Sequence, residues 1–224
     1  MPLRTAEAFI LRTYPLKESD KIVSFFTREW GKRRGVARAA SRPKSKFGSM
    51  LEPLSQVRVQ YFEREGKDLC NLDHCELVAS MVETAGRDLL HSVAIAVMVE
   101  VADRMLPESE ASDATFRLLQ AVTSNMREGS REGAWLALTY YLYWMVRLGG
   151  YLPQFSLSPA AAALTETMAK SALNAVPAAQ AAVCAAAAGH ELRDRLRGAI
   201  EEHLEAGLKS WALLAGLAGR EGPA

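Results

Sequence analysis

The chain has 224 residues, of which 49% are hydrophobic and 24% charged, and its formal net charge at pH 7 is +1. This composition is typical of a soluble globular protein with one large domain or two small ones. Its three cysteines are an odd number, which excludes a fully paired disulfide framework and fits a reducing cytoplasm.

No segment predicts secretion or membrane insertion. The first twenty residues lack the long apolar run after a basic start that a signal peptide needs. The most apolar stretch, AWLALTYYLYWMV at 134–146, is shorter than the roughly 20 residues needed to cross a bilayer. We therefore expect a buried helix there and no membrane partner.

Charge is distributed unevenly along the chain. Residues 1–80 hold 15 Lys or Arg and 10 Asp or Glu, whereas residues 81–224 hold 12 and 16. Eight of the basic residues lie between 28 and 46, where the chain average would place about two. This cluster predicts an anionic partner for the first 80 residues.

The first 80 residues are predicted to form β-strands. LSQVRVQYF alternates apolar and polar residues with the period of a half-buried strand, and other runs are rich in β-branched and aromatic residues. The predicted strands are 6–14, 21–29, 32–39, 54–62 and 68–78. Tight hairpins are expected at Gly31-Lys32 and Glu65-Gly66. Five short strands predict a small barrel, most commonly an OB-fold, although periodicity alone does not distinguish it from an SH3-like barrel.

From about residue 81 the apolar spacing becomes helical. The predicted helices are 88–106, 115–126, 134–148, 157–173, 177–189 and 191–217. Pro107 is expected to end the first of them and Gly149-Gly150 to cap the third. The sequence therefore predicts an α+β protein of two domains: a five-stranded OB-fold β-barrel at 1–80 and an all-α helical bundle at 81–224.

The basic segment is the candidate binding site. On a strand through 34–40, Arg34 and Arg38 would share one face, and Gly35 would lie on the other among small residues that can pack tightly. Cations at strand spacing that continue into a flexible loop can follow a phosphate backbone. The candidate phosphate ligands are Lys32, Arg33, Arg34, Arg38, Arg42, Lys44 and Lys46. The alternative is a solvated charged face that only maintains solubility.

Three aromatic residues lie near this segment. Tyr14, Trp30 and Phe47 could stack on unpaired bases, as aromatic side chains do in grooves that bind single strands. For Trp30 and Tyr14 the alternative is a place in the barrel core.

The sequence predicts no catalytic or metal site. It contains no P-loop, no G-x-G-x-x-G and no G-x-S-x-G motif. Cys70, His74 and Cys75 have no partner at ligand spacing to complete the four ligands of a structural zinc site. On a continuous strand the two cysteines would point to opposite faces, so a pair of semi-buried thiols is predicted. We expect a protein that is not an enzyme and needs no cofactor.

Four stretches of the chain resemble a known family. They are ILRTYPLKESDKIVSFFTREWGK at 10–32, SRPKSKFGSMLEP at 41–53, RLGGYLPQ at 147–154 and LRGAIEEHLEAGLKSWALL at 196–214. Their order and spacing resemble those of the RecO family of bacterial DNA repair and recombination mediators. The resemblance covers most of the chain and is thin only in the alanine-rich region 157–190.

The resemblance implies an N-terminal OB-fold, a C-terminal helical domain and a cytoplasmic, nucleoid-associated protein. Members of the family bind single- and double-stranded DNA and anneal complementary strands. With RecR they help to place RecA on DNA covered by the single-stranded-DNA-binding protein SSB, whose C-terminal tail is a further partner. The family pattern includes Lys32, Arg38, Arg42, Lys44 and Lys46, whereas Arg33 and Arg34 lie where many relatives have apolar or small residues.

The chain departs from the family pattern in two places. Many relatives have Lys-Gly-Ala-Arg-Arg where this chain has RAASR at 38–42, and the missing glycine argues against close approach of the backbone to DNA there. Many also carry a four-cysteine zinc site after the Gly-Tyr-x-Pro stretch. The corresponding FSLSPAAAALTETMAK contains no cysteine, so we expect that zinc site to be absent.

Two other functions fit the same residues. One is an OB-fold RNA-binding module of translation or RNA processing, whose basic barrel would look alike. The other is a helical scaffold whose barrel docks to an acidic protein.

Overall fold

The computed structural model of the protein describes residues 2–63, 66 and 68–218. The chain divides into two compact units. The first consists of Met1–Glu83 and Ala102–Phe116, and the second of Thr84–Val101 and Arg117–Ala224. The first unit thus includes a segment from the half that is predicted to be helical, while the predicted domain boundary at 80 and 81 stays a prediction.

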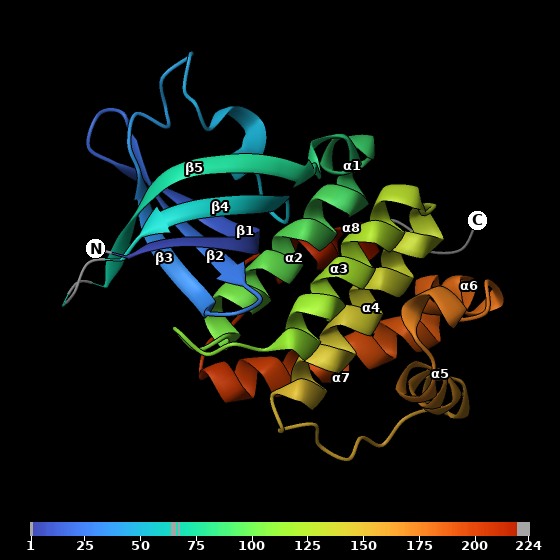
Figure 1. Cartoon of the computed structure of the whole chain (residues 1–224). Helices are drawn as coiled ribbons and strands as arrows, with labels where there is room; N and C mark the ends of the chain where they lie inside the picture. Colours follow the sequence, from blue (N-terminus) through green and yellow to red (C-terminus); the bar gives the residue numbers. More distant parts are fainter. Residues whose placement is uncertain (1, 64–65, 67, 219–224) are drawn as a thin grey trace. The chain divides into compact units, whose positions relative to one another are not determined.

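Five strands in the described part of the first unit close into a barrel (Figure 1). They are β1 (Leu3–Leu16), β2 (Asp20–Thr27), β3 (Gly31–Ala37), β4 (Gln56–Phe62) and β5 (Leu69–Ala79). Their order around the barrel is β1-β2-β3-β5-β4, with β3 and β5 parallel and the other pairs antiparallel. This order is that of the OB-fold, so the predicted fold is confirmed and the SH3-like alternative is excluded.

The barrel interior is closely packed. Its core includes Ile10, Val23, Phe25, Val57, Val59 and Tyr61, all completely buried. Gly35 lies on the inner face of β3, where an added Cβ would lie 2.2 Å from Leu72 Cδ1 and 2.6 Å from Cys70 Sγ. The prediction that this face of β3 carries small residues that pack tightly is confirmed at Gly35. The second predicted hairpin, at Glu65-Gly66, lies partly outside the described residues.

A β-bulge in β5 overturns the prediction for the two cysteines on that strand. Gln60 of β4 pairs with His74, but its neighbour Tyr61 pairs with Leu72, so one residue between them has no partner across the ladder. The extra residue shifts the alternation of inward and outward side chains. Cys70 and Cys75 therefore both point into the barrel core, where burial raises the pKa of each thiol to about 12.

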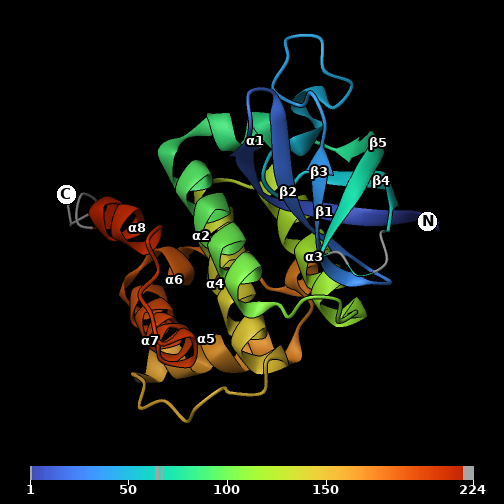
Figure 2. The same ribbon diagram turned by 90° about the vertical axis from the view of Figure 1, so that its left-hand side faces the viewer.

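The remaining elements are helical (Figures 1 and 2). The α-helices are α1 (Val82–Arg87), α2 (Leu89–Met105), α3 (Asp113–Glu128), α4 (Arg131–Leu148), α5 (Pro159–Lys170), α6 (Ala179–Ala185), α7 (Ala187–Leu204) and α8 (Trp211–Ala218). Short 3₁₀ turns are η1 (Gly48–Leu51) and η2 (Leu173–Ala175). In the second unit, α5, α6 and α7 pack against α4, whose side chains are buried around most of its circumference. The predicted buried helix at 134–146 is confirmed. Among the described residues, none of the helices combines the length and the hydropathy that a membrane span requires.

The predicted last helix, 191–217, is divided in two. The first part, α7, ends at Leu204, and Glu205 takes a left-handed backbone conformation with φ of +50°. The second part, α8, begins where the buried carboxylate of Glu100 accepts hydrogen bonds from the backbone N–H groups of Lys209 (2.9 Å) and Ser210 (2.7 Å). Both residues immediately precede Trp211, so this carboxylate lies at the N-terminus of α8, where the first N–H groups of a helix have no internal partner. Glu100 therefore fixes a helix boundary that periodicity does not reveal.

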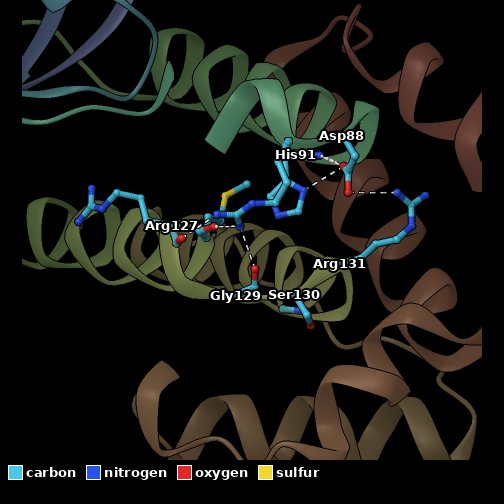
Figure 3. Close-up of polar contacts among 9 residues, drawn as sticks. Asp88, His91, Arg127, Gly129, Ser130 and Arg131 are labelled. Atoms are coloured by element: carbon cyan, nitrogen blue, oxygen red, sulfur yellow. Dashed lines mark hydrogen bonds and ion pairs between the residues drawn. The ribbon is translucent and has the colours of Figure 1, made fainter. Parts of the chain in front are cut away.

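Two charged residues before and at the start of α2 cap helix ends in the second unit (Figure 3). The Arg87 guanidinium donates to the backbone oxygens of Met126 (3.0 Å), Arg127 (2.8 Å) and Gly129 (2.8 Å), at the C-terminus of α3. A cation is favourable there because the last carbonyls of a helix have no internal partner.

The other residue is Asp88, whose carboxylate accepts from the backbone N–H and the ring of His91, both at 2.9 Å. It also lies 3.4 Å from Arg131 Nη1 (Figure 3). The two caps connect the junction of α1 and α2 to the turn between α3 and α4.

Candidate nucleic-acid interface

The seven predicted basic residues separate into two groups with different surroundings. Three of them, Lys32, Arg33 and Arg34, belong to β3. The other four follow β3 in the loop that leads to η1: Arg38, Arg42, Lys44 and Lys46.

The β3 group is engaged with acidic and carbonyl oxygens of the same unit. Lys32 is only 8% exposed, and its Nζ donates to the backbone oxygen of Asp103 at 2.7 Å. The same Nζ lies 3.5 Å from Glu108 Oε1. Arg34 Nε lies 3.3 Å from that oxygen, so one carboxylate serves two cations. Contact of these residues with phosphate stays a prediction.

The regular strand ends before the predicted row of cations does. Arg33 is half-buried, with its guanidinium 3.5 Å from Glu63. The strand ends at Ala37 rather than continuing to residue 40, and Ala39 adopts a left-handed conformation with φ of +55°. Arg38 is exposed in the turn that follows. The cations are thus continuous in sequence but do not lie on one strand face.

The loop after β3 is fixed at both ends. At its start, the backbone N–H of Ala39 donates to Asp20 Oδ1 (2.8 Å) and that of Ser41 donates to the backbone oxygen of Ser19 (2.9 Å). At its end, Phe47 is completely buried in the barrel core. Both views show this loop beside the β1–β2 turn, at one end of the barrel (Figures 1 and 2).

The loop carries exposed positive charge. Arg38, Arg42 and Lys44 are exposed, and none of them forms an ion pair within the described part of the chain. Lys46 is exposed too, and its Nζ lies 3.6 Å from Asp73 Oδ1. Exposed pairs of this kind contribute little to stability, so this ammonium group is also open to an anion.

Sequence reasoning missed two lysines at the same end of the barrel. Lys17 and Lys21 flank the β1–β2 turn, which the hydrogen bond between Ser41 and Ser19 holds against the cationic loop. Their sequence signal is cancelled by Glu18 and Asp20 between them, so the segment has no net charge. We call the combined set the loop-end cluster: Lys17, Lys21, Arg38, Arg42, Lys44 and Lys46.

The nearby aromatic residues are mostly unavailable to bases. Phe47 lies in the core, so for this residue the stacking prediction is wrong. Trp30 is partly buried beneath Arg4, whose guanidinium lies 4.8 Å from the ring centroid. Tyr14 is exposed, and its hydroxyl donates to Asp103 (3.1 Å); partial burial and this carboxylate raise the pKa of Tyr14. Stacking by Tyr14 stays a prediction.

The outer face of β2 and β3 is covered by the distant segment Ala102–Phe116 of the same unit. Ser24 donates to Asp103 Oδ1 at 2.6 Å, and Arg28 Nε donates to Asp113 Oδ1 at 2.7 Å. These contacts join residues about 80 positions apart, and no local pattern in the sequence indicates them. This segment therefore binds cations of β3 and of the β2–β3 turn, whereas Arg38, Arg42 and Lys44 form no ion pair with it in the described part of the chain.

The described residues contain no group of three or more His, Cys, Asp or Glu that could hold a metal ion. All three cysteines are free and buried. Burial raises the pKa of Cys184 to about 11, and those of Cys70 and Cys75 to about 12. At neutral pH these side chains are therefore thiols and not the thiolates that act as nucleophiles or metal ligands.

Two family models match the chain in sequence order. Recombination protein O N terminal matches residues 1–81, which contain the barrel, and Recombination protein O C terminal matches residues 86–160. The chain belongs to the RecO family. The matched regions end at the beginning of α5, so the resemblance of residues 196–214 to the closing helix of the family stays a prediction.

Several curated relatives in the RecO family are similar over the same region, and each is named DNA repair protein RecO. The relative from Koribacter versatilis (strain Ellin345) is 45% identical over 151 residues, which cover 67% of this chain and 60% of the relative. The one from Cutibacterium acnes is 34% identical over 157 residues, or 68% of this chain and 63% of the relative. The one from Streptomyces avermitilis is 34% identical over 163 residues, which cover 70% of this chain and 64% of the relative. The chain thus aligns with somewhat less than two thirds of the length of these relatives.

Proposed function

We propose that the protein is a non-enzymatic recombination mediator of DNA repair that binds single- and double-stranded DNA through its barrel. The observation that carries the proposal is the loop-end cluster, in which two loops bring five exposed cations to one end of an OB-fold, beside the half-buried Lys21 of β2. Loops of OB-folds are a common binding site for oligonucleotides. The names of the RecO relatives support the same role.

The chemistry of the loop-end cluster suits annealing of complementary strands. Two strands repel each other through their phosphates, and cations that neutralise part of each strand lower the cost of bringing them together. Each neutralised phosphate releases a condensed counterion, which makes binding depend on salt and not on base sequence. If the six cations of the cluster neutralise six phosphates of single-stranded DNA, log K falls with log salt with a slope of about −4.

The protein partners follow from family membership alone. We propose that the protein works with RecR to load RecA onto DNA coated with SSB, and that it binds the C-terminal tail of SSB. We also propose a cytoplasmic, nucleoid-associated location. Transfer of a strand between coating proteins requires contacts that open quickly, and electrostatic contacts to the backbone meet this requirement.

The test is DNA binding and strand annealing by a charge-reversal variant of the loop. R42E/K44E/K46E changes three exposed side chains and leaves the buried Phe47 anchor in place. We expect the affinity for a fluorescent oligonucleotide to fall and the salt slope to become less steep by about 2, because three phosphate contacts are lost. The rate at which the variant anneals SSB-coated complementary oligonucleotides should fall together with its DNA affinity.

The matched control is K170E/R195E/K209E, which changes the net charge by the same amount at exposed positions of the second unit. It should bind DNA as the wild type does. An equal loss of DNA affinity in both triple variants would show a general effect of net charge and would refute the loop-end cluster as the binding site. DNA binding that is unchanged in the loop variant would favour docking of the barrel to an acidic protein.

A competition titration separates DNA from RNA. Single-stranded DNA and RNA oligonucleotides of the same sequence compete for the protein, and complementary DNA strands are tested for annealing in parallel. Preferential binding of RNA without annealing activity would favour the RNA-binding module.

A further inference from the structure

Residues 103–113, which we call the acidic segment, lie against the outer face of β3 through backbone contacts. The N–H of Ser109 donates to the backbone oxygen of Lys32 at 2.9 Å, and Lys32 also forms an isolated parallel bridge with Glu108. Beside it, Gly31 has a φ of +66°, and a Cβ at this position would lie 2.1 Å from the backbone oxygen of Glu110. The segment thus follows the strand so closely that only a glycine fits beneath it.

The acidic segment presents carboxylates to the cations of this face. Asp113 accepts a hydrogen bond from Arg28 Nε at 2.7 Å. Glu108 Oε1 lies 3.3 Å from Arg34 Nε. These are the positions that phosphate oxygens would occupy if a nucleic acid lay on the same surface, because both anions bind guanidinium groups with similar geometry.

The covered surface is the one that OB-folds generally use, since oligonucleotides bind on the face of strands 2 and 3 as well as in the loops. We propose that the acidic segment competes with nucleic-acid phosphates for Arg28 and Arg34, and so keeps the affinity of this face low. The loop-end cluster remains open. This inference rests on the proposed function, because it concerns the same barrel and the same ligand.

Exposure determines which cations the competition affects. In the pair of Arg28 with Asp113 the side chains are 38% and 56% exposed, and in that of Arg34 with Glu108 they are 49% and 45% exposed. Exposed ion pairs are weak, so a phosphate can replace the carboxylate. Lys32, whose side chain is only 10% exposed, stays bound to the backbone oxygen of Asp103 and takes no part in the exchange.

The test is a gain of affinity in E108Q/D113N. Each substitution removes one negative charge, and neither changes the backbone contacts of the segment. A unit charge about 8 Å from a phosphate in water-like screening changes a binding constant about twofold. We therefore expect the double variant to bind single-stranded DNA about fourfold more tightly at low salt, because it removes two such charges. Its salt slope should be steeper by about 1.4, because two more phosphates are neutralised.

Two controls separate the freed arginines from net charge. E76Q removes a carboxylate that is 55% exposed and paired with Arg58 on the β4–β5 side of the barrel, and it should leave the affinity unchanged. R34A should have little effect in the wild type but should remove the gain in the E108Q background. A gain that E76Q reproduces, or that persists in E108Q/R34A, would overturn the inference.

The outcomes distinguish this inference from the proposed function. If E108Q/D113N binds as the wild type does while R42E/K44E/K46E loses affinity, the competition is absent and the loop-end site stands. If E108Q/D113N gains affinity and the loop variant is unaffected, the acidic segment has the inferred role but the loop-end site is wrong. If neither the wild type nor E108Q/D113N binds nucleic acid, both proposals fail.

Discussion

Replacement of Gly31 by alanine tests the close contact between β3 and the acidic segment. The φ of +66° at this position costs a residue with a Cβ about 1–2 kcal/mol. The new Cβ would also lie 2.1 Å from the Glu110 oxygen and 2.3 Å from its carbonyl carbon, far inside the roughly 3.5 Å of a van der Waals contact. Moving the backbone to relieve such a clash costs about 1–3 kcal/mol. We therefore expect Gly31→Ala to lower the free energy of unfolding by about 2–5 kcal/mol.

Gly48→Ala is the matched control, because Gly48 has a φ of +46° but no atom within 4 Å of the added Cβ. It carries the backbone cost alone and should lower the free energy of unfolding by about 1–2 kcal/mol. Urea unfolding followed by circular dichroism gives the midpoint and the m value for the wild type and both variants. Equal destabilisation by the two substitutions would refute the close approach of Glu110 to β3.

Two further predictions concern titratable groups in and near the two cores. Partial burial opposes ionisation of Asp88, but the hydrogen bonds from His91 and the charge of Arg131 outweigh it and lower the pKa of this carboxyl. The stabilisation by ionised Asp88 is therefore complete above its ordinary pKa of about 3.9 and is lost as the pH falls below it, so the stability difference between wild type and D88N should shrink in acid. A difference in urea midpoints that stays constant from pH 7 to pH 3 would contradict this. The raised pKa values of about 12 for Cys70 and Cys75 and about 11 for Cys184 predict that iodoacetamide modifies none of them in the folded protein at pH 8, and all three in urea. Rapid labelling of the folded protein, measured by mass spectrometry, would show that the thiols are not buried.

The strands were predictable because their signal is local. Alternation in β4 and the breakers between the runs indicate five strands, and five strands in 80 residues indicate a small barrel. The strand order is not local, and only the parallel pairing of β3 with β5 decides between barrel types. The bulge in β5 is equally hidden, because a single extra residue reverses the inward face without changing the composition.

The errors in the helical region and at the site arise from contacts that are distant in sequence. The apolar stripe through residues 192–208 continues past the end of α7, so periodicity predicts one helix where Glu100 begins a second. The cationic cluster at 28–46 is visible in the sequence, but the sequence does not show that its members separate into paired cations on β3 and exposed cations in the loop after it. Glu108 lies more than 70 positions from the β3 cations that it neutralises, and Lys17 joins the site only through the fold.

The buried position of Phe47 has a consequence for how the cationic loop can evolve or be transplanted. Its ring is part of the barrel core, so the loop acquires its shape only when the barrel folds, and an isolated peptide of this sequence would lack that shape. Between Ser41 and Phe47 the Ser45 Oγ accepts a hydrogen bond from the backbone N–H of Phe47 (3.2 Å), whereas the side chains of Arg42, Lys44 and Lys46 are exposed. The cations can therefore change positions within the loop during evolution while their number stays the same. Phe47, in contrast, must remain a large apolar residue, because it anchors the end of the loop in the barrel core.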